Sequence, residues 1–296
     1  MLESCTVCPR NCRKNRLKNE EGYCRSGLKI KVSSIGPHYG EEPPISGTKG
    51  SGTVFFSNCN LRCRFCQNYQ ISQEGLGYFI SEEELADKML ELQVQGCHNI
   101  NLVSPTHFGP QILKTIIMAK GKGLAVPIVY NSNGYESLEM LKLFDGYIDI
   151  YLPDIKYSDN KMALKYSEVG DYVENNRTAI KEMFRQVGEL KLDENGIAVK
   201  GMIVRHLVLP NNIAGSYESL KFLASIYPDI QISIMSQYSP CHKAIGDPDL
   251  GRKLTKEEYE KALKWADDFG FLNIFIQEMG SSENYLPDFN RRNPFE

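Results

Sequence analysis

Three closely spaced cysteines are the residues of this chain best suited to chemistry. Cys59, Cys63 and Cys66 stand at intervals of four and three residues. Three thiolates on one loop can converge on one face of an iron–sulfur cluster, and a [4Fe–4S] cluster normally takes four cysteine ligands. Three local ligands leave one iron with an open coordination position. Because an open iron can bind a substrate or cofactor, the motif predicts chemistry and not electron storage alone.

A second group of cysteines precedes this motif. Cys5, Cys8, Cys12 and Cys24 lie in a segment rich in arginine and lysine, which would offset the charge of thiolates. Four thiolates can close a tetrahedral Zn²⁺ site or hold an auxiliary iron–sulfur cluster. Three interpretations stay open: structural zinc, a second cluster that is structural or relays electrons, and ordinary reduced thiols.

The remaining two cysteines stand apart from both groups. Cys97 follows a glycine at the end of a predicted helix, and we expect it to pack there as a small apolar residue. Cys241 sits beside His242 in a polar loop. We interpret Cys241 as an ordinary thiol, with a reactive thiol as the alternative.

The composition is that of a cytoplasmic globular protein. The chain has 296 residues, 42% of them hydrophobic and 24% charged, with a net charge of −3. This charge creates no large basic field, so neither nucleic acid nor a membrane surface is an expected partner. No apolar run reaches the length of a membrane helix, and the N-terminus lacks the apolar core of a signal peptide. Clustered cysteines in a cytoplasmic protein indicate metal ligation and not disulfides.

Short apolar runs alternate with amphipathic stretches from about residue 51 onward. Capping boxes at Ser81–Glu84 and Thr255–Glu258 predict two helix starts. Asp193–Gly196 is typical of a hairpin turn. The predicted strands are Gly52–Ser57, Asn99–Val103, Pro127–Ser132, Ile148–Leu152, Met202–Leu209, Gln231–Met235 and Leu272–Gln277.

This alternation predicts an α/β fold with parallel strands and right-handed crossovers. We expect a partial TIM-type (β/α)6 parallel barrel over residues 51–296. Residues 1–50 have little periodic pattern and are predicted to form a Cys-rich, metal-binding N-terminal extension, because a bound metal can staple a segment with little core.

Polar side chains follow the predicted strands at the rim where parallel barrels build their active sites. The three clustered cysteines come after the first strand, on this same rim. The others are Ser104, Thr106 and His107 after the second strand, Asn131 and Asn133 at the end of the third, Asp154 and Lys156 after the fourth, and Arg205 and His206 on the fifth.

Several of these residues also have a purely structural interpretation. Asp154 and Lys156 can form an exposed salt bridge, which contributes about 1 kcal/mol or less. Asn133, followed by Gly134, is typical of a turn. His206 lies among apolar residues and is as well explained by a hydrogen-bonded core histidine as by a cofactor contact.

The Cys-x3-Cys-x2-Cys run after the first strand, with Phe65 before the last cysteine, resembles the motif of the radical S-adenosylmethionine superfamily. The chain is most similar to the branch of pyruvate formate-lyase activating enzyme, roughly from Ile35 to the end of the sixth strand. The runs Gly36–His38, Glu41–Gly47 and Cys66–Asn68 resemble a subgroup of these activase-like proteins.

Two features depart from the family pattern. The superfamily often has a Gly-Gly-Glu stretch after the second strand, which holds the amino group of S-adenosylmethionine. Here Ser104, Pro105, Thr106 and His107 take this place. Related enzymes with extra clusters carry their added cysteines after the first motif, whereas the four extra cysteines here precede it.

The resemblance implies that a [4Fe–4S] cluster on Cys59, Cys63 and Cys66 binds S-adenosylmethionine and cleaves it reductively. The products are methionine and a 5′-deoxyadenosyl radical, which abstracts a hydrogen atom from a substrate. The residues expected to bind the cofactor are Phe65, Ser104, Thr106, Asn131, Asn133, Asp154, Lys156 and His206. His107 is expected on the substrate side, and no side chain is singled out as catalytic.

The same resemblance implies protein partners. An electron donor such as flavodoxin or ferredoxin would reduce the cluster, and a glycyl radical enzyme is a possible target. The alternatives are radical modification of a small molecule or of another protein. A third possibility, from a different class, is an iron–sulfur electron carrier or binding module.

Overall fold

A computed structural model describes residues 1–227, 229–280, 286–291 and 293–295. Its centre is one mixed sheet with the strand order β10-β9-β8-β6-β5-β4-β2-β1-β3. The strands are β1 (Ile30–His38), β2 (Ser51–Phe56), β3 (Tyr78–Ile80), β4 (Ile100–Val103), β5 (Ile128–Ser132), β6 (Ile150–Pro153), β7 (Lys191–Leu192), β8 (Ala198–Leu207), β9 (Gln231–Met235) and β10 (Ile274–Ile276).

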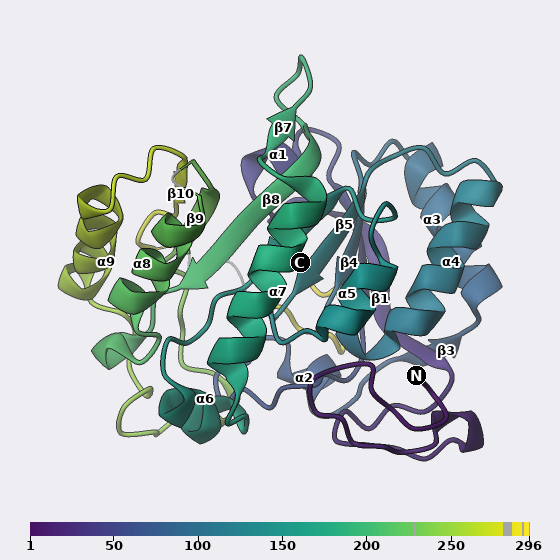
Figure 1. Cartoon of the computed structure of the whole chain (residues 1–296), viewed down its shortest axis with the longest axis horizontal. Helices are drawn as coiled ribbons and strands as arrows, with labels where there is room; N and C mark the ends of the chain where they lie inside the picture. The colour runs from purple at the N-terminus through teal and green to yellow at the C-terminus, as the bar shows by residue number, and fades with distance from the viewer. Residues whose placement is uncertain (228, 281–285, 292, 296) are drawn as a thin grey trace.

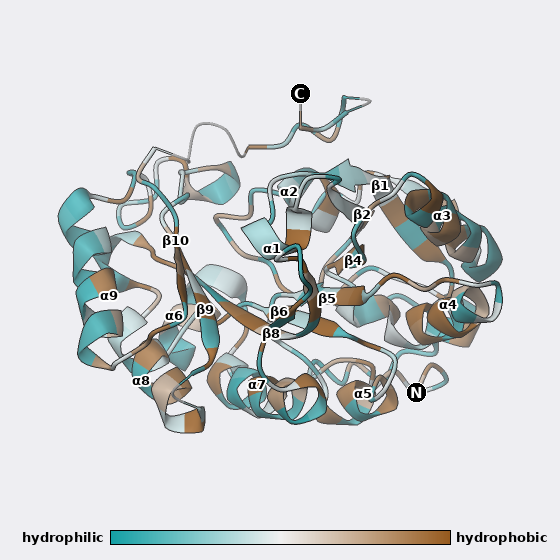
Figure 2. Cartoon of the chain, turned by 90° about the horizontal axis from the view of Figure 1, so that it is seen from above, coloured by the Kyte–Doolittle hydropathy of each residue, from teal (hydrophilic) through white to brown (hydrophobic). Residues whose placement is uncertain are grey.

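Neighbouring strands from β2 to β10 along this order are parallel. The sheet is strongly curved, and larger helices cover its convex face (Figure 2). The helices are α1 (Pro43–Ser46), α2 (Tyr69–Ser72), α3 (Glu82–Val94), α4 (Gly109–Gly121), α5 (Leu138–Leu143), α6 (Asn160–Ser167), α7 (Tyr172–Val187), α8 (Ser216–Ile226) and α9 (Lys256–Asp268), with short 3-10 turns η1 (Arg16–Lys18), η2 (Thr106–Phe108), η3 (Pro210–Asn212) and η4 (His242–Ala244). The predicted α/β class with a partial parallel barrel is confirmed.

Local sequence signals account for several of these elements. Ser81 and Thr255 cap α3 and α9 in complete capping boxes, as predicted. The turn between β7 and β8 is held by Asp193, whose Oδ1 accepts hydrogen bonds from the backbone N–H groups of Asn195 and Ile197. Since Gly196 has φ 77°, its lack of a side chain suits this turn.

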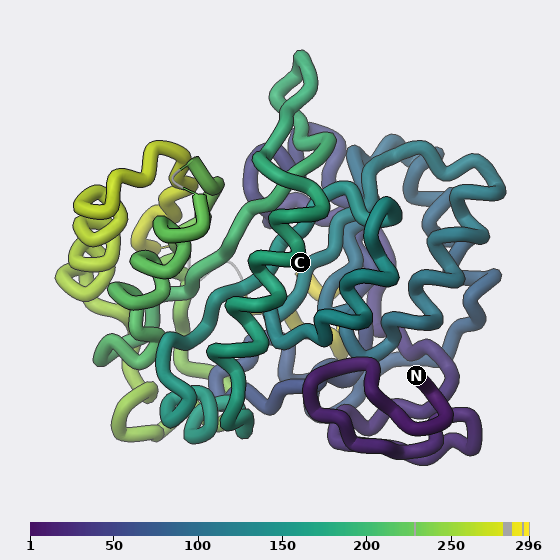
Figure 3. Tube along the Cα trace, viewed as in Figure 1, coloured from purple at the N-terminus to yellow at the C-terminus, as the bar shows by residue number. Residues whose placement is uncertain are grey.

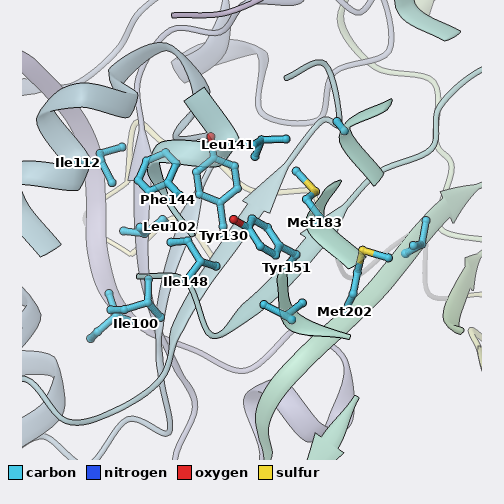
Figure 4. Packing of buried hydrophobic residues seen from close by; sticks show 14 of the residues in the cluster. Ile100, Leu102, Ile112, Tyr130, Leu141, Phe144, Ile148, Tyr151, Met183 and Met202 are labelled. Carbon is cyan, nitrogen blue, oxygen red and sulfur yellow. The ribbon is translucent and has the colours of Figure 1, made fainter. Parts of the chain in front are cut away.

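The main core lies between the convex face of the sheet and its helices. Tyr130 on β5 packs on Phe144 and on Tyr151, with ring centroids 5.3 and 5.8 Å apart. Met183 on α7 and Met202 on β8 extend the same layer (Figure 4). This layer fixes the strand ends and therefore the positions of the loops that follow them. In the described ranges, no helix is long and apolar enough to span a bilayer.

Two antiparallel strands were not predicted. β1 pairs with β2 and β3 pairs with β1, so residues 30–38 belong to the same sheet as the parallel strands. The short helix α1 then turns inward, and Ile45 packs against Val129 and Ile150 inside the curve of the sheet. Residues 1–29, which we call the N-terminal lobe, contain only η1 as regular structure and lie below the sheet, beside its lower edge (Figures 1 and 3).

Candidate active site

The concave side of the sheet encloses a cavity of about 470 Å³. All three motif cysteines line it. Six other predicted site residues also line it: Phe65, Ser104, Asn131, Asn133, Asp154 and Lys156. These nine predicted residues therefore lie around one cavity, although they come from segments far apart in the chain.

The loop that carries the motif cysteines is held by its backbone. It leaves β2 through Asn58, whose N–H donates to the carbonyl oxygen of Ile71 at 2.8 Å. The N–H of Arg64 donates to the carbonyl oxygen of Tyr166 in α6, also at 2.8 Å. Asn58 has φ 71°, a left-handed conformation that asparagine tolerates better than most residues. These contacts point the three cysteines toward the cavity instead of solvent.

Each motif sulfur has a polar partner. Cys59 Sγ accepts from the N–H of Leu61 at 3.4 Å, and Cys63 Sγ accepts from Ser167 Oγ at 3.0 Å. Cys66 Sγ and Ser72 Oγ are 3.2 Å apart. Such donors stabilise negative charge on sulfur, as outer-shell hydrogen bonds do around metal-bound thiolates.

Burial acts against this charge in the free thiols. It raises the pKa of Cys59 to about 11 and that of Cys66 to about 12, and it also raises the pKa of Cys63. Free thiols here would therefore stay protonated at neutral pH, and coordination to iron supplies the charge that makes them thiolates. Buried sulfurs with donors already aimed at them fit the ligands of an iron–sulfur cluster.

Asp154 and Lys156 form an ion pair inside the cavity. Lys156 Nζ lies 2.5 Å from Asp154 Oδ2, and their side chains are only 17% and 20% exposed. Burial alone would lower the pKa of Lys156, but the charge of Asp154 outweighs it and raises the pKa. Lys156 therefore stays charged beside the motif, and the alternative of an exposed surface salt bridge does not describe this pair.

The two asparagines at the end of β5 and just beyond it differ in role. Asn131 lines the cavity as the inward-facing residue of the strand end. Asn133 forms a turn, since its Oδ1 accepts from the N–H of Tyr135 at 2.9 Å, and its Nδ2 donates to Asn60 at 2.8 Å and to Cys59 Sγ at 3.3 Å. Asn133 thus forms the turn that was one interpretation of the sequence, and it also supports the motif loop.

Phe65 and Ser104 complete the predicted lining. Phe65 packs edge-on against Tyr157 and Tyr238, with ring centroids 6.5 and 6.0 Å apart. Its ring closes the cavity beside the motif. Ser104 has φ 57° and its N–H donates to the carbonyl oxygen of Asn131 at 2.8 Å. This bend follows β4, at the place where the superfamily that the motif resembles often has glycines.

Thr106, His107 and His206 do not line the cavity. Thr106 Oγ1 donates to Glu136 at 2.5 Å, and burial raises the pKa of Glu136 to about 7. His107 is buried, its Nε2–H donates to the carbonyl oxygen of Ser57 at 2.9 Å, and burial lowers its pKa to about 3. Through these contacts, Thr106 and His107 stabilise the loops at the strand ends. His107 was expected on the substrate side, but it is buried away from the cavity.

His206 has both ring nitrogens occupied by the protein. Nδ1 donates to the carbonyl oxygen of Ile155 and Nε2 accepts from Ser216 Oγ, each at 2.8 Å. A carbonyl oxygen can only accept, which fixes the proton on Nδ1. Burial lowers the pKa of His206 to about 4. The core alternative that the sequence left open therefore describes this histidine.

A buried ionic cluster on the cavity wall was missed. Arg205 on β8 donates from Nε to Glu42 Oε1 at 2.8 Å and from Nη2 to Glu41 and to Glu42. His38 Nδ1 lies 3.4 Å from Glu41 Oε1. Burial opposes the charge on Glu41, but Arg205 outweighs it and lowers the pKa to about 2. An arginine in an apolar strand and a Glu-Glu-Pro-Pro run were the available signals, but neither indicated that they meet.

The four N-terminal cysteines lie in the N-terminal lobe, next to the motif loop. Cys5, Cys8 and Cys24 are buried, and the pKa of Cys8 is raised by burial and by the nearby Cys24 and Cys5. Backbone N–H groups of Val7 and Arg10 point at the sulfurs of Cys5 and Cys8. In the described ranges, no three His, Cys, Asp or Glu side chains are arranged as ligands of a single metal ion, and this includes the four N-terminal cysteines.

Two arginines join the lobe to the motif loop, and a third joins it to the turn after β4. Arg10 Nε donates to the carbonyl oxygen of Asn60 and Arg62 Nη2 to that of Tyr23, each at 3.0 Å. Arg16 is buried and donates to the carbonyl oxygen of His107 at 2.5 Å. Because Arg62 precedes Cys63 and Tyr23 precedes Cys24, one hydrogen bond joins the neighbours of the two cysteine groups.

Known proteins are similar to this chain in sequence or in fold. Residues 53–212 match the family model of the Radical SAM superfamily. An uncharacterized protein of Methanocaldococcus jannaschii is 32% identical over 291 residues, which cover 93% of this chain and 78% of that protein.

Solved structures show the same fold at low identity. HydG, a maturase of the [FeFe]-hydrogenase, has a TM-score of 0.53 at 14% identity, over 80% of this chain and 54% of that chain. SuiB of Streptococcus suis, bound to its precursor peptide SuiA, has a TM-score of 0.51 at 14% identity, over 78% of this chain and 49% of that chain. The chain spans about half the length of these two proteins. From the family match over residues 53–212, together with the motif and the parallel sheet that contains it, this chain belongs to the radical S-adenosylmethionine superfamily.

Proposed function

We propose that this protein cleaves S-adenosylmethionine reductively and uses the resulting radical to abstract a hydrogen atom from a protein substrate. In this family a [4Fe–4S] cluster, when bound and reduced, supplies the electron that yields methionine and a 5′-deoxyadenosyl radical. The observation that carries the proposal is that Cys59, Cys63 and Cys66 share one cavity with the Asp154–Lys156 pair. An electron carrier has no need of such a cavity beside its cluster.

The side chains around the motif suit the two ends of S-adenosylmethionine. Lys156, which stays charged, can pair with the methionine carboxylate, and Asp154 can accept from its ammonium group. Asn131 can donate to and accept from ribose hydroxyls. This chain has no Gly-Gly-Glu stretch after β4. The hydroxyl of Ser104, which lines the cavity there, can contact the amino group instead. Phe65 keeps water from the motif.

We propose a glycyl radical enzyme as the target, through loss of a hydrogen atom from a backbone glycine. The support is the resemblance of the cysteine motif and the Asp154-x-Lys156 pair to the activating enzyme of pyruvate formate-lyase. A small-molecule target is the second candidate, because Pro287 and Phe295 of the C-terminal segment also line the cavity and narrow its open side. Figure 2 shows this segment passing over the opening of the curved sheet.

We further propose that Cys5, Cys8, Cys12 and Cys24 bind a second metal, either zinc or an iron–sulfur cluster. Three buried thiols with backbone donors aimed at two of them support this assignment. The nearness of the lobe to the motif loop allows either a structural role or an electron relay. Iron, sulfide and zinc measured in the wild type and in Cys5→Ala and Cys24→Ala variants distinguish the two metals. The proposed cellular location is the cytoplasm, with a redox protein as electron donor.

Label transfer tests the target. The reduced protein is mixed with S-adenosylmethionine and a candidate glycyl radical enzyme that carries deuterated glycine. We expect deuterium in 5′-deoxyadenosine and a glycyl radical signal in electron paramagnetic resonance. Deuterium transfer from small molecules, with none from any protein, would instead support the second candidate.

A further inference from the structure

The charge of this protein is divided sharply along the chain. Residues 1–29, the N-terminal lobe, contain seven Lys and Arg against three Glu, a net charge of +4, whereas residues 30–296 contain 27 against 34, a net charge of −7. The overall value of −3 hides this division. A basic lobe on an acidic body produces a local field that a partner can recognise.

Much of this positive charge is both exposed and uncompensated. Arg13, Lys14, Lys18 and Lys29 are exposed. None of the four forms an ion pair with an acidic side chain in the part of the chain that the structure describes. Elsewhere, exposed lysines such as Lys88, Lys122 and Lys165 have acidic partners within 4 Å. The lobe therefore keeps its charge available to another molecule.

The lobe is also fixed directly beside the motif loop. Arg10 contacts the carbonyl oxygen of Asn60, the residue after Cys59, and Arg62 contacts the carbonyl oxygen of Tyr23. The guanidinium carbons of Arg10 and Arg62 lie 3.7 and 5.5 Å from the centre of the Tyr23 ring. Arg25 also donates to the carbonyl oxygen of Gln73 at 3.3 Å, an oxygen that Arg62 of the motif loop shares. A molecule that binds the lobe therefore lies near the motif loop.

We propose that the N-terminal lobe is the docking surface for a compact acidic redox protein that delivers the electron to the motif site. The inference rests on the proposed function, since it assumes a cluster on the motif cysteines. In this step the donor loses one electron and the cluster gains one, and no atoms are transferred. Opposite charges bring the two proteins together quickly without requiring a large apolar interface.

The distribution of charge favours a small acidic protein over a nucleic acid. A long polyanion bound at the lobe would run along the rest of the protein, whose net charge is −7. The only aromatic residue of the segment, Tyr23, is already packed under Arg10 and bonded to Glu168, so it is not available for stacking on a base. A compact partner can cover the lobe alone.

Charge reversal tests this surface. The variant Arg13→Glu, Lys14→Glu, Lys18→Glu, Lys29→Glu is compared with the wild type for formation of 5′-deoxyadenosine, driven by an acidic flavodoxin with its reductase and NADPH or by dithionite. We expect the flavodoxin-driven rate to fall about tenfold or more. The dithionite-driven rate should stay within twofold, because a small reductant needs no docking surface.

A matched control reverses four exposed lysines away from the lobe, Lys191, Lys200, Lys221 and Lys264. It changes the net charge by the same amount and should leave the flavodoxin-driven rate within twofold. In the wild type, raising ionic strength should slow the flavodoxin-driven reaction and not the dithionite-driven one. This salt test does not depend on the folding of any variant.

Several results would overturn the proposal. They are an unchanged flavodoxin-driven rate in the lobe variant, an equal loss in the control, a salt-independent rate, or RNA binding that the lobe variant abolishes while electron delivery is unaffected. Failure of the wild type to form 5′-deoxyadenosine with dithionite would instead contradict the proposed function itself.

Discussion

Charged side chains inside the cavity remain charged because each is paired. Burial alone would neutralise Lys156 and Glu41, yet the pKa of Lys156 is raised and that of Glu41 is lowered to about 2. In both residues the charge of the partner outweighs desolvation. Removing one member of such a pair leaves the other buried and unpaired, which costs more free energy than the pair contributes.

Lys156→Met should weaken the binding of S-adenosylmethionine by roughly 10- to 100-fold, since a charge-assisted hydrogen bond to the carboxylate is lost. Equilibrium binding to the reconstituted protein measures the change. Lys165→Met is the control, because the exposed Lys165–Asp249 pair, 2.7 Å long, lies outside the cavity. Equal affinity in wild type and Lys156→Met would exclude Lys156 from the binding site.

His206 should make stability depend on pH. Its folded pKa of about 4 lies below the ordinary value of 6.5, so its contribution is present above pH 6.5 and is lost as pH falls through 4. From this shift, the contribution of His206 to the free energy of unfolding of the wild type should fall by about 2 kcal/mol between pH 7.5 and pH 5. Urea unfolding of wild type and His206→Gln at both pH values isolates the contribution of His206. Equal pH dependence of the free energy of unfolding in the two proteins would refute the prediction.

The spacing of residues predicted which side chains carry chemistry better than it predicted where they point. Three cysteines within eight residues must lie on one loop, so their convergence followed from the sequence alone. Side chains on a strand alternate between the two faces. Since Arg205 faces the cavity, His206 must face Ser216 behind the sheet. The sequence predicts that successive residues face opposite sides of the sheet, but not which of them face the cavity.

At the scale of elements, the helix α1 and the strand β8 are joined by charge. The guanidinium group of Arg205 holds Glu41 and Glu42, which lie just before α1. Ile45 of α1 then fills the inside of the sheet. Apolar packing and one ionic cluster together fix α1 against the inside of the curved sheet.

Arg205→Gln should lower the free energy of unfolding by about 3–5 kcal/mol, because two buried carboxylates lose their partner. The double variant Arg205→Gln, Glu42→Gln should recover part of this loss, since one buried charge is then removed. Chemical denaturation measures both. For comparison, Lys88→Gln breaks the exposed pair with Glu91 and should cost about 1 kcal/mol or less. A similar small loss for Arg205→Gln would show that the cluster is not a structural tie.

The parallel strands and the hairpin turn between β7 and β8 were predicted well, whereas the antiparallel strands β1 and β3 were not. Strands β2, β4, β5 and β6 are apolar runs buried on both faces, and such runs stand out between turn residues. β1 contains Ser33, Ser34, Gly36 and Pro37, which interrupt any alternation. Its pairing with β2 is set by tertiary contacts that no local pattern records.

At the scale of the whole molecule, the N-terminal lobe contacts the loop that carries the motif, and the C-terminal segment lines the cavity. The N-terminal lobe lies against the motif loop, and Phe295 near the C-terminus packs on His38 with ring centroids 4.3 Å apart. Both contacts span more than 40 residues of sequence. Contacts at this range depend on the completed sheet, so the sequence could not place either end.

Metal removal should loosen the lobe before it loosens the sheet. Residues 1–29 have little regular structure and few apolar residues, so a bound metal would supply much of their stability. We expect a strong chelator to speed tryptic cleavage between Arg10 and Lys18 by about tenfold or more, with the rest of the chain cut at its former rate. The Cys24→Ala variant should show the fast cleavage without chelator. Equal protection in both proteins would argue against a metal staple.

The most direct test of the central claim is the formation of 5′-deoxyadenosine. The wild type, reconstituted anaerobically with iron and sulfide, is reduced with dithionite and given S-adenosylmethionine. We expect equal amounts of 5′-deoxyadenosine and methionine from the wild type and from Cys97→Ala, which removes a buried cysteine of the core. Cys63→Ala should form neither. Absence of both products in the wild type, or their persistence in Cys63→Ala, would contradict the account.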